Sequence, residues 1–269
     1  MSHSLSRVAV TMLLATGLTF PASAHELKVF ASQQAIAEPG TKSTIYLSWG
    51  HRVPVDDLID AASVERYDLV APDGTVAALK ATDVGLHTNS VEFKQTGLYR
   101  AVTSRKASVF TYVFDGDGNR VLKRGPKSGI TEGKIDTATR SVMAGTALIL
   151  VGKAGDAAPK AVGLPVEITP LDGPAKWAAN TDIRFEVLIG GKAVTNTFPI
   201  VEARYVGFKP DNAWSYATTA NKDGVATIRP DRAGTWVVKV NVKRPAPDVQ
   251  KSEFDTESFT ATLSLEVRP

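Results

Sequence analysis

The sequence predicts an all-β fold, with two immunoglobulin-like or transthyretin-like β-sandwich domains after a cleaved signal peptide. Apolar and polar residues alternate with a period of two in many short runs, which is typical of half-buried strands. Turn-forming Gly, Pro, Asp and Asn residues separate these runs at a spacing of about 8–12 residues, as in sandwich folds. The pattern contains one modest helical candidate, Val55–Ala62, with Asp56 and Asp57 in its first turn.

The first segment has the organisation of a secretory signal peptide. Arg7 precedes a continuous apolar run of 13 residues, Val8–Phe20, and Ala22-Ser23-Ala24 supplies the small residues that signal peptidase reads. An uncleaved anchor helix is the alternative, but this run is too short to cross a bilayer comfortably. We therefore expect residues 1–24 to be removed and the mature protein to be periplasmic, without stable membrane insertion. Its first residue would be His25.

The first domain is expected to span residues 25–151. The runs that predict strands there are Leu27–Ala31, Thr44–Trp49, Tyr67–Ala71, Thr75–Lys80, Ser90–Phe93, Leu98–Thr103, Val109–Phe114 and Thr146–Val151. Residues 120–142 are polar and aperiodic, which predicts a long surface loop or an arm over the sheet.

The segment Asp115–Asn119 begins like a calcium-binding loop, with acidic or amide residues at alternate positions. Its sixth position is Arg120 rather than Gly, and its twelfth is Pro126 rather than Glu. A hairpin turn is therefore the favoured interpretation.

A change in composition marks a linker at residues 152–163, which are rich in Gly, Ala and Pro. The second domain follows at residues 164–269, and Gly190-Gly191 predicts a tight hairpin turn within it. Its expected strands are Pro165–Thr169, Asp182–Ile189, Pro199–Val206, Trp214–Thr218, Val225–Arg229, Thr235–Val242 and Ser258–Val267.

The composition argues against several classes of function. The net charge is only +3, from 31 basic and 28 acidic residues, and gives no footprint for nucleic acid. There is no Cys, so disulfides and thiolate metal sites are excluded. No nucleophile elbow, phosphate-binding loop or zincin motif is present, and we expect a protein that is not an enzyme. The Trp residues fall mostly on expected strands and favour a sandwich core over a sugar-binding platform.

The histidines carry the chemistry that remains. Of four His residues, three belong to the mature chain, namely His25, His51 and His87, and all lie in the first domain. A mature N-terminal His offers its α-amine and its ring nitrogen to one ion, and a second imidazole would complete a nitrogen-rich site for Ni, Co, Cu or Zn. The amine and imidazole have ordinary pKa values of about 8 and 6.5, so a metal can displace their protons at neutral pH.

Other roles for these residues stay open at this point. A His is usually a surface or half-buried polar residue, and of the three only His25 gains support as a ligand from its position at the expected N-terminus. Carboxylates nearby in the sequence, Glu26, Asp83 and Glu92, could join a metal site or remain solvated.

Two stretches resemble a known family. One contains Ala24–Phe30, Ala37–Gly40 and Ile45–His51, and the other contains Gly163–Leu171, Ile183–Ile189, Gly191–Val194, Asn221–Ala226 and Gly234–Trp236. Together they resemble a family of exported proteins of unknown function, described as the periplasmic component of cobalt/nickel ABC-type transport. The resemblance implies two β-domains, a role in divalent metal uptake or handling, and a membrane importer as partner. It extends to His25 and to His51 in the Trp-Gly-His match.

The chain departs from this family in two places. Members often carry a further His near the C-terminus, but residues 256–262 contain none, and the Lys- and Tyr-rich stretch before the middle strand is altered at residues 104–110. The main hypothesis is a periplasmic transition-metal binding protein. One alternative is a structural or adhesive module that binds protein or polysaccharide without metal. Another is a copper enzyme with an N-terminal His ligand.

Overall fold

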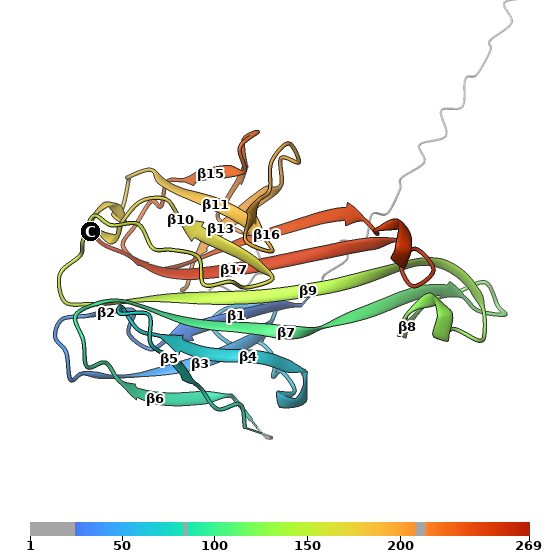
Figure 1. Cartoon of the computed structure of the whole chain (residues 1–269), viewed down its shortest axis with the longest axis horizontal. Helices are drawn as coiled ribbons and strands as arrows, with labels where there is room; N and C mark the ends of the chain where they lie inside the picture. The colour runs from blue at the N-terminus through green and yellow to red at the C-terminus, as the bar shows by residue number, and fades with distance from the viewer. Residues whose placement is uncertain (1–24, 83–84, 208–213) are drawn as a thin grey trace, which may run out of the picture.

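A computed structural model describes residues 25–82, 85–207 and 214–269 (Figure 1). The expected signal peptide and Asp83 lie outside the described residues. The fold is all-β and sandwich-like, as predicted, and its helical segments within the described ranges are short 3₁₀ turns. These turns are η1 (Ala61–Ser63), η2 (Lys127–Gly129), η3 (Pro174–Lys176) and η4 (Asp248–Gln250).

The helix predicted at Val55–Ala62 is wrong. Only η1 forms at its end, because the preceding backbone pairs with a strand instead: the N–H of Asp57 donates to the carbonyl of Trp49 at 2.9 Å. A helix of eight residues is marginal in water, so a strand contact of this kind easily replaces it.

The largest sheet of the structure has ten strands and lies at its centre. Its main path is β14 (Tyr216–Thr219), β13 (Ile200–Tyr205), β16 (Gly234–Pro245), β17 (Thr256–Val267), β9 (Lys134–Val151), β7 (Gly97–Phe114), β4 (Val64–Val70) and β5 (Val76–Ala78). Two further strands join it off this path, β2 (Ala35–Ile36) on β9 and β8 (Arg120–Arg124) on β7.

This sheet is continuous across the expected domain boundary. β17 pairs with β9 in parallel, from Thr256 opposite Thr139 to Ser264 opposite Ala147. Residues 152–165 contain no strand and connect β9 to β10. The segments 25–151 and 164–269 are thus joined by hydrogen bonds within one sheet as well as by the connecting chain.

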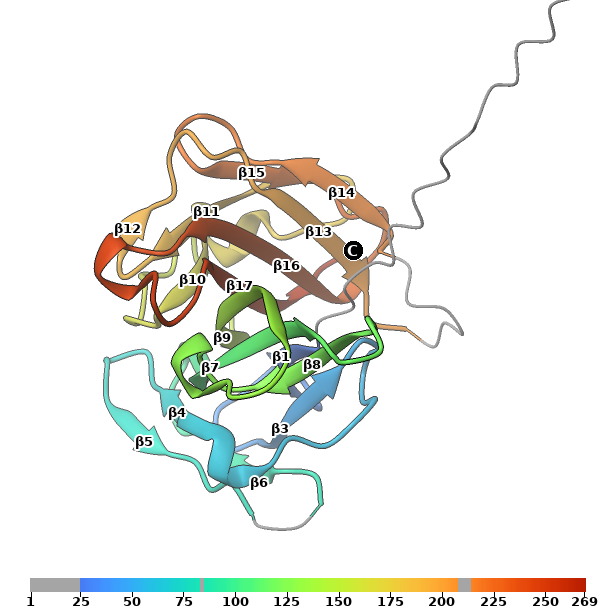
Figure 2. The same ribbon diagram turned by 90° about the vertical axis from the view of Figure 1, so that its right-hand side faces the viewer.

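Two smaller sheets cover the two faces of the central sheet (Figures 1 and 2). One comes from the first half of the chain, with β1 (Glu26–Ala31), β3 (Lys42–Gly50) and β6 (Thr88–Glu92). The other comes from the second half, with β10 (Val166–Pro170), β11 (Ile183–Ile189), β12 (Lys192–Ala193) and β15 (Val225–Ile228).

Alternation along β9 supplies both hydrophobic cores. Met143 and Ile149 join the core beneath β1 and β3, whereas Ala144 and Leu148 join the core beneath β10 and β11. Side chains of a strand alternate between the two faces of its sheet, so one strand can serve two sandwiches. Trp236 is buried in the second core, with 2% of its surface exposed.

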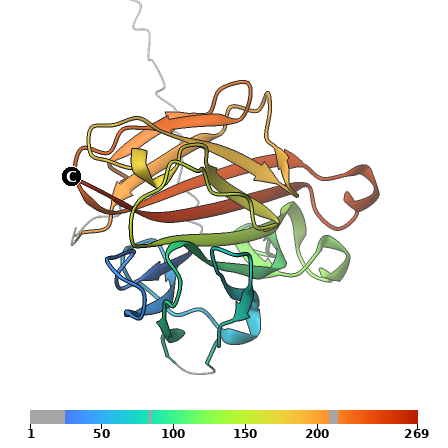
Figure 3. The same cartoon turned by 60° about the vertical axis from the view of Figure 1, so that its left-hand side comes forward.

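The loop predicted at residues 120–142 is also wrong. The segment forms β8, η2 and the first part of β9. The two strands pair with β7, and together they form a projecting arm (Figures 1 and 3). The sequence is polar because the arm extends beyond the smaller sheets and buries few side chains. The only buried cluster among its described residues contains Ala138, packed with Ala246 and Phe254.

The predicted turns are confirmed. Between β7 and β8, the carboxylate of Asp115 accepts the backbone N–H groups of Asp117 and Asn119 at 3.0 and 2.8 Å, so it closes a hairpin turn. Gly190 and Gly191 both have positive φ, 56° and 75°, as a type I′ turn requires. No helix in the described part of the chain is long and apolar enough to cross a membrane.

Candidate metal centre

The structure brings His25 and His51 together. Their ring centroids are 4.6 Å apart, with an angle of 37° between the ring planes. Glu26 lies opposite Gly50 at the last pair of the antiparallel β1–β3 ladder, so His25 and His51 follow one step beyond this pair. The strand register therefore juxtaposes two side chains that lie 26 positions apart in the sequence.

An aromatic and an acidic group flank this histidine pair. The His25 ring stacks on the Trp49 ring with centroids 5.3 Å apart and planes only 7° apart. Its Nε2 atom is 4.0 Å from the nearer carboxylate oxygen of Asp57. The His25 side chain retains 45% of its exposure, so the pair is accessible to an ion from solvent.

The electrostatics keep His51 neutral at lower pH than usual. Burial lowers the pKa of His51, and the proximity of His25 lowers it further. A neutral imidazole has the lone pair that a metal ion requires.

The backbone beneath His51 adopts a conformation that only glycine tolerates readily. Gly50 has φ +109°, and a Cβ at this position would lie 2.5 Å from the Oδ2 atom of Asp56. That oxygen accepts the N–H of His51 at 2.7 Å and the N–H of Arg52 at 3.2 Å. These hydrogen bonds hold the pKa of Asp56 below its ordinary value, so the carboxylate remains charged and fixes the turn.

A network of buried charged side chains contacts the same turn through the Gly50 carbonyl. Lys28 is fully buried, and its Nζ atom donates to the Gly50 carbonyl at 2.6 Å and to Glu26 at 3.3 Å. Burial lowers the pKa of Lys28 to about 8, although Glu26 opposes the shift. Glu26 also accepts from Lys239 of β16 at 3.0 Å, so the network reaches into the second half of the chain.

The second half also contacts His51 directly. Arg204 of β13 is 3% exposed, and its Nη2 atom donates to the His51 carbonyl at 3.1 Å. The Trp214 ring lies 5.0 Å from the Arg204 guanidinium carbon and 4.4 Å from the Lys239 Nζ atom. Together with Lys28 and Asp56, Arg204 fixes the backbone polar groups on both sides of the His51 Cα.

Sequence reasoning missed Lys28, Arg204 and Lys239. The one local signal is a cation inside an otherwise apolar strand, as in Leu27-Lys28-Val29 and Ala203-Arg204-Tyr205. Such a residue normally points to solvent from the polar face of a strand. Nothing local shows that both faces are covered here.

His87 is not brought to this pair. It is 2% exposed; its Nε2 atom lies 2.7 Å from the Ile59 carbonyl, and its Nδ1 atom accepts the Thr82 N–H at 3.2 Å. Both ring nitrogens of His87 are engaged by the backbone, which favours a structural role over the metal-ligand role that the sequence predicts. Glu92 lies exposed at the end of β6.

The described side chains alone do not complete a metal site. Residues 25–82, 85–207 and 214–269 contain no group of three or more His, Cys, Asp and Glu that could hold a metal ion. Two imidazoles meet at His25 and His51, so a third donor would have to come from elsewhere. The α-amine that cleavage before His25 would create is such a donor.

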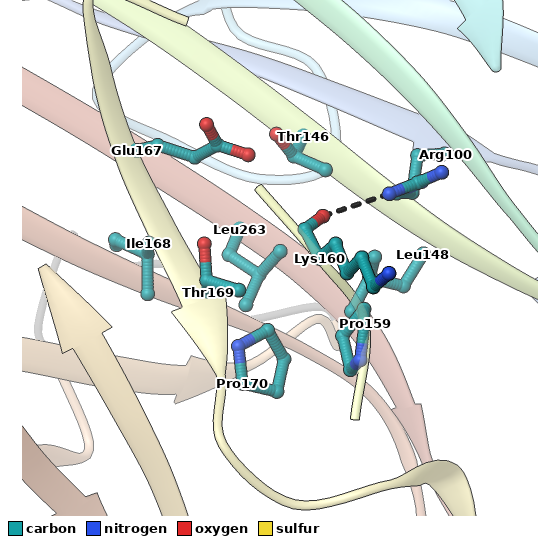
Figure 4. A pocket seen from close by; sticks show the side chains of 10 residues that line it. All are labelled: Arg100, Thr146, Leu148, Pro159, Lys160, Glu167, Ile168, Thr169, Pro170 and Leu263. Carbon is teal, nitrogen blue, oxygen red and sulfur yellow. Dashed lines mark hydrogen bonds between the residues drawn. The ribbon is translucent and has the colours of Figure 1, made fainter. Parts of the chain in front are cut away.

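One small cavity of the structure is lined by residues other than the described histidines. It lies between β9, β10 and the 159–160 backbone and has a volume of about 10 Å³, room for about one water molecule (Figure 4). The guanidinium of Arg100 spans it to donate to the Lys160 carbonyl at 2.7 Å. Burial raises the pKa of Glu167 on its wall, but this carboxylate is held by the Val162 N–H at 2.8 Å.

Comparisons with known proteins give a family and distant structural likenesses. The D0–D1 domains of intimin share 14% identity over 91% of this chain and 98% of that chain, with a TM-score of 0.22. The three N-terminal domains of the bacteriophage RB49 outer capsid protein Hoc share 12% identity over 89% of this chain and 59% of that chain, with a TM-score of 0.20. No curated protein matches the chain. A family model matches residues 22–244, and the chain therefore belongs to the family described as domain of unknown function DUF4198.

Proposed function

We propose that the exported protein binds one divalent transition-metal ion at the His25–His51 pair. The α-amine and ring nitrogen of a mature N-terminal His25 would chelate the ion, and His51 would supply a second imidazole. The observation that carries this proposal is the 4.6 Å separation of the two ring centroids, since it places both imidazoles beside one another at the expected start of the mature chain.

The donor set favours borderline metals. Nitrogen ligands suit Ni, Cu, Co and Zn, and the chain has no Cys that would direct the site toward softer ions. The Asp57 carboxylate lies 4.0 Å from the His25 Nε2 atom, which is beyond hydrogen-bond distance but near enough to balance the charge of a bound cation. The Trp49 ring restricts the orientation of the His25 ring by stacking on it.

The surroundings favour a binding protein over an enzyme. The site is open, and Lys28, Asp56 and Arg204 contact backbone atoms of its turn rather than the imidazoles. Protons compete with the metal for the amine and the imidazoles, so the ion would be bound reversibly. We propose that the protein handles nickel or cobalt in the periplasm and passes the ion to a membrane importer.

The decisive experiment compares two forms that differ only at the N-terminus. Intact mass of the exported protein should match residues 25–269. Calorimetry with Ni²⁺, Co²⁺, Cu²⁺ and Zn²⁺ should show one site in this form. A variant with one extra Ala before His25 should bind far more weakly, because its amine becomes an amide while every side chain is retained.

Each outcome distinguishes the alternatives. Equal binding by the extended form would exclude the amine chelate. Absence of binding in both forms would favour a structural or adhesive module. Turnover of a redox substrate by the copper-loaded protein would favour the copper-enzyme alternative.

A further inference from the structure

The projecting arm carries a net positive charge, whereas the rest of the mature chain has a net negative charge. We define the arm as residues 105–140, which include the C-terminal part of β7, all of β8 and the N-terminal part of β9. It contains eight basic and four acidic residues, whereas the rest of residues 25–269 contains 22 basic and 24 acidic residues. The net charge is therefore +4 on the arm and −2 on the remainder.

Half of the basic residues in the arm form no ion pair with a described carboxylate. Arg120, Lys123, Lys127 and Arg140 pair with carboxylates. No carboxylate within the described ranges forms an ion pair with the other four, which are Arg105, Lys106, Arg124 and Lys134. Uncompensated charge of one sign on a projecting element favours an anionic partner.

One face of the arm combines this charge with aromatic and aliphatic side chains. We call it the arm face. Phe110, Tyr112 and Phe114 alternate on β7, and Leu122 lies directly opposite Tyr112 on β8. Phe114 and Leu122 are 38% and 52% exposed. Arg124 and Arg120 lie opposite Phe110 and Phe114, so both arginines flank the same face.

The other face of the arm is covered over part of its length, although Ile135, opposite Val113, is 37% exposed there. Thr111 and Val113 point to the covered side and are fully buried, and Ala138 packs there against Ala246 and Phe254. Figures 1 and 2 show the arm extending past the smaller sheets at one end of the molecule.

We propose that the arm face binds the surface of an anionic phospholipid membrane. Aromatic rings and arginines with apolar stems are the side chains that reside at the membrane interface, and basic residues near it are attracted by anionic headgroups. A specific protein interface uses about 20–30 residues on each side, far more than the arm face provides. A membrane requires no matching shape, so a narrow basic and aromatic strip is sufficient.

This docking would orient the candidate metal centre. The Arg105 guanidinium carbon at the base of the arm lies 5.0 Å from the centroid of Trp49, whose ring also stacks on His25. The histidine pair is therefore adjacent to the arm. The membrane proposal does not depend on metal binding, and the two fail separately.

The test is cosedimentation of the mature protein with vesicles in the presence of a chelator. We expect binding to vesicles of equimolar phosphatidylcholine and phosphatidylglycerol, loss of this binding in high salt, and no binding to pure phosphatidylcholine. The double variant Arg120→Gln/Arg124→Gln should bind about 30-fold more weakly, at about 5-fold for each charge removed. Phe114→Ser/Leu122→Ser should also bind more weakly.

Matched controls lie on the second half of the chain. Lys222→Gln/Arg229→Gln removes two charges from exposed ion pairs, and Phe198→Ser/Ile200→Ser removes two exposed apolar side chains. These variants should bind like the wild type. The proposal is overturned if the wild type does not bind the anionic vesicles, if it binds pure phosphatidylcholine equally, or if the controls lose as much affinity as the arm variants.

Discussion

The guanidinium of Arg204 donates a hydrogen bond to the backbone carbonyl of His51, 3.1 Å away, although 153 positions separate the two residues. This contact joins the second half of the chain to the candidate metal centre in the first half. A buried arginine is costly unless its charge and donors are satisfied. Its placement on the carbonyl of a proposed ligand residue indicates that the second half positions His51.

Replacement of Arg204 should weaken metal binding without removing a ligand. Arg204→Met should lower affinity by roughly 10–100-fold, the usual effect of losing a group that orients a ligand, and Arg204→Lys should restore part of it. Calorimetry gives the affinity, and chemical denaturation gives the accompanying loss of stability. Arg140→Met is the control, since Arg140 pairs with the buried carboxylate of Glu257 and lies on the arm. Equal affinity in Arg204→Met and the wild type would refute the positioning role.

Substitutions of His51 and His87 should have different effects on metal affinity and on stability. His51→Ala should reduce metal affinity strongly with little loss of stability. His87→Ala should leave affinity unchanged and destabilise the fold by about 1–3 kcal/mol, because the Thr82 N–H and the Ile59 carbonyl lose their partner. Parallel calorimetry and urea denaturation of both variants test this. A loss of metal affinity in His87→Ala would contradict the assignment of His87 as structural.

Asp172 should make stability depend on acid pH. Its hydrogen bonds with Arg184, at 2.8 and 3.0 Å, hold its pKa at about 2. The folded state therefore binds fewer protons than the unfolded state, so this stabilisation is complete above about pH 4 and is lost as the pH falls toward 2. Asp172→Asn should cost on the order of 1–2 kcal/mol at neutral pH and flatten the curve of stability against pH in that range.

The control for that experiment is Asp182→Asn. Asp182 pairs with Arg229 at 2.7 Å, but both side chains are more than half exposed, so little stability should be lost. Urea denaturation at several pH values compares the two variants. An acid dependence in Asp172→Asn as steep as in the wild type would show that another group is responsible.

Trp236 should be essential to the second core. Trp236→Ala should cost about 3–5 kcal/mol, since a large aromatic side chain that is 2% exposed would leave a cavity. Trp49→Ala should cost less, because Trp49 is only partly buried at the edge of the first core. Guanidinium denaturation followed by circular dichroism measures both. Similar losses in the two variants would contradict the burial that distinguishes them.

Local patterns in the sequence determined the strands and turns of this protein. Alternation placed the segment around Thr235–Val242 on a strand, because covering one face of a strand more completely than the other favours a period of two. The strand expected at Leu27–Ala31 also forms, although it is buried on both faces. It did not reveal that residues 120–142 are mostly strand. The backbone of this segment pairs with β7, but most of its side chains remain at least partly exposed, so no alternation of apolar and polar residues is required. The pairing of β17 with β9 was likewise hidden, because contacts between distant segments leave no local period.

The candidate site divides in the same way. The sequence by itself determined which residues offer nitrogen ligands, and the A-x-A motif at Ala22–Ala24 predicts that His25 begins the mature chain. Only the tertiary structure decided that His51 meets His25 while His87 does not, because strand register sets which side chains are neighbours. The same folding buries Lys28 and Arg204 beneath His51, where burial on both faces of their strands turns ordinary charged residues into supports for the site.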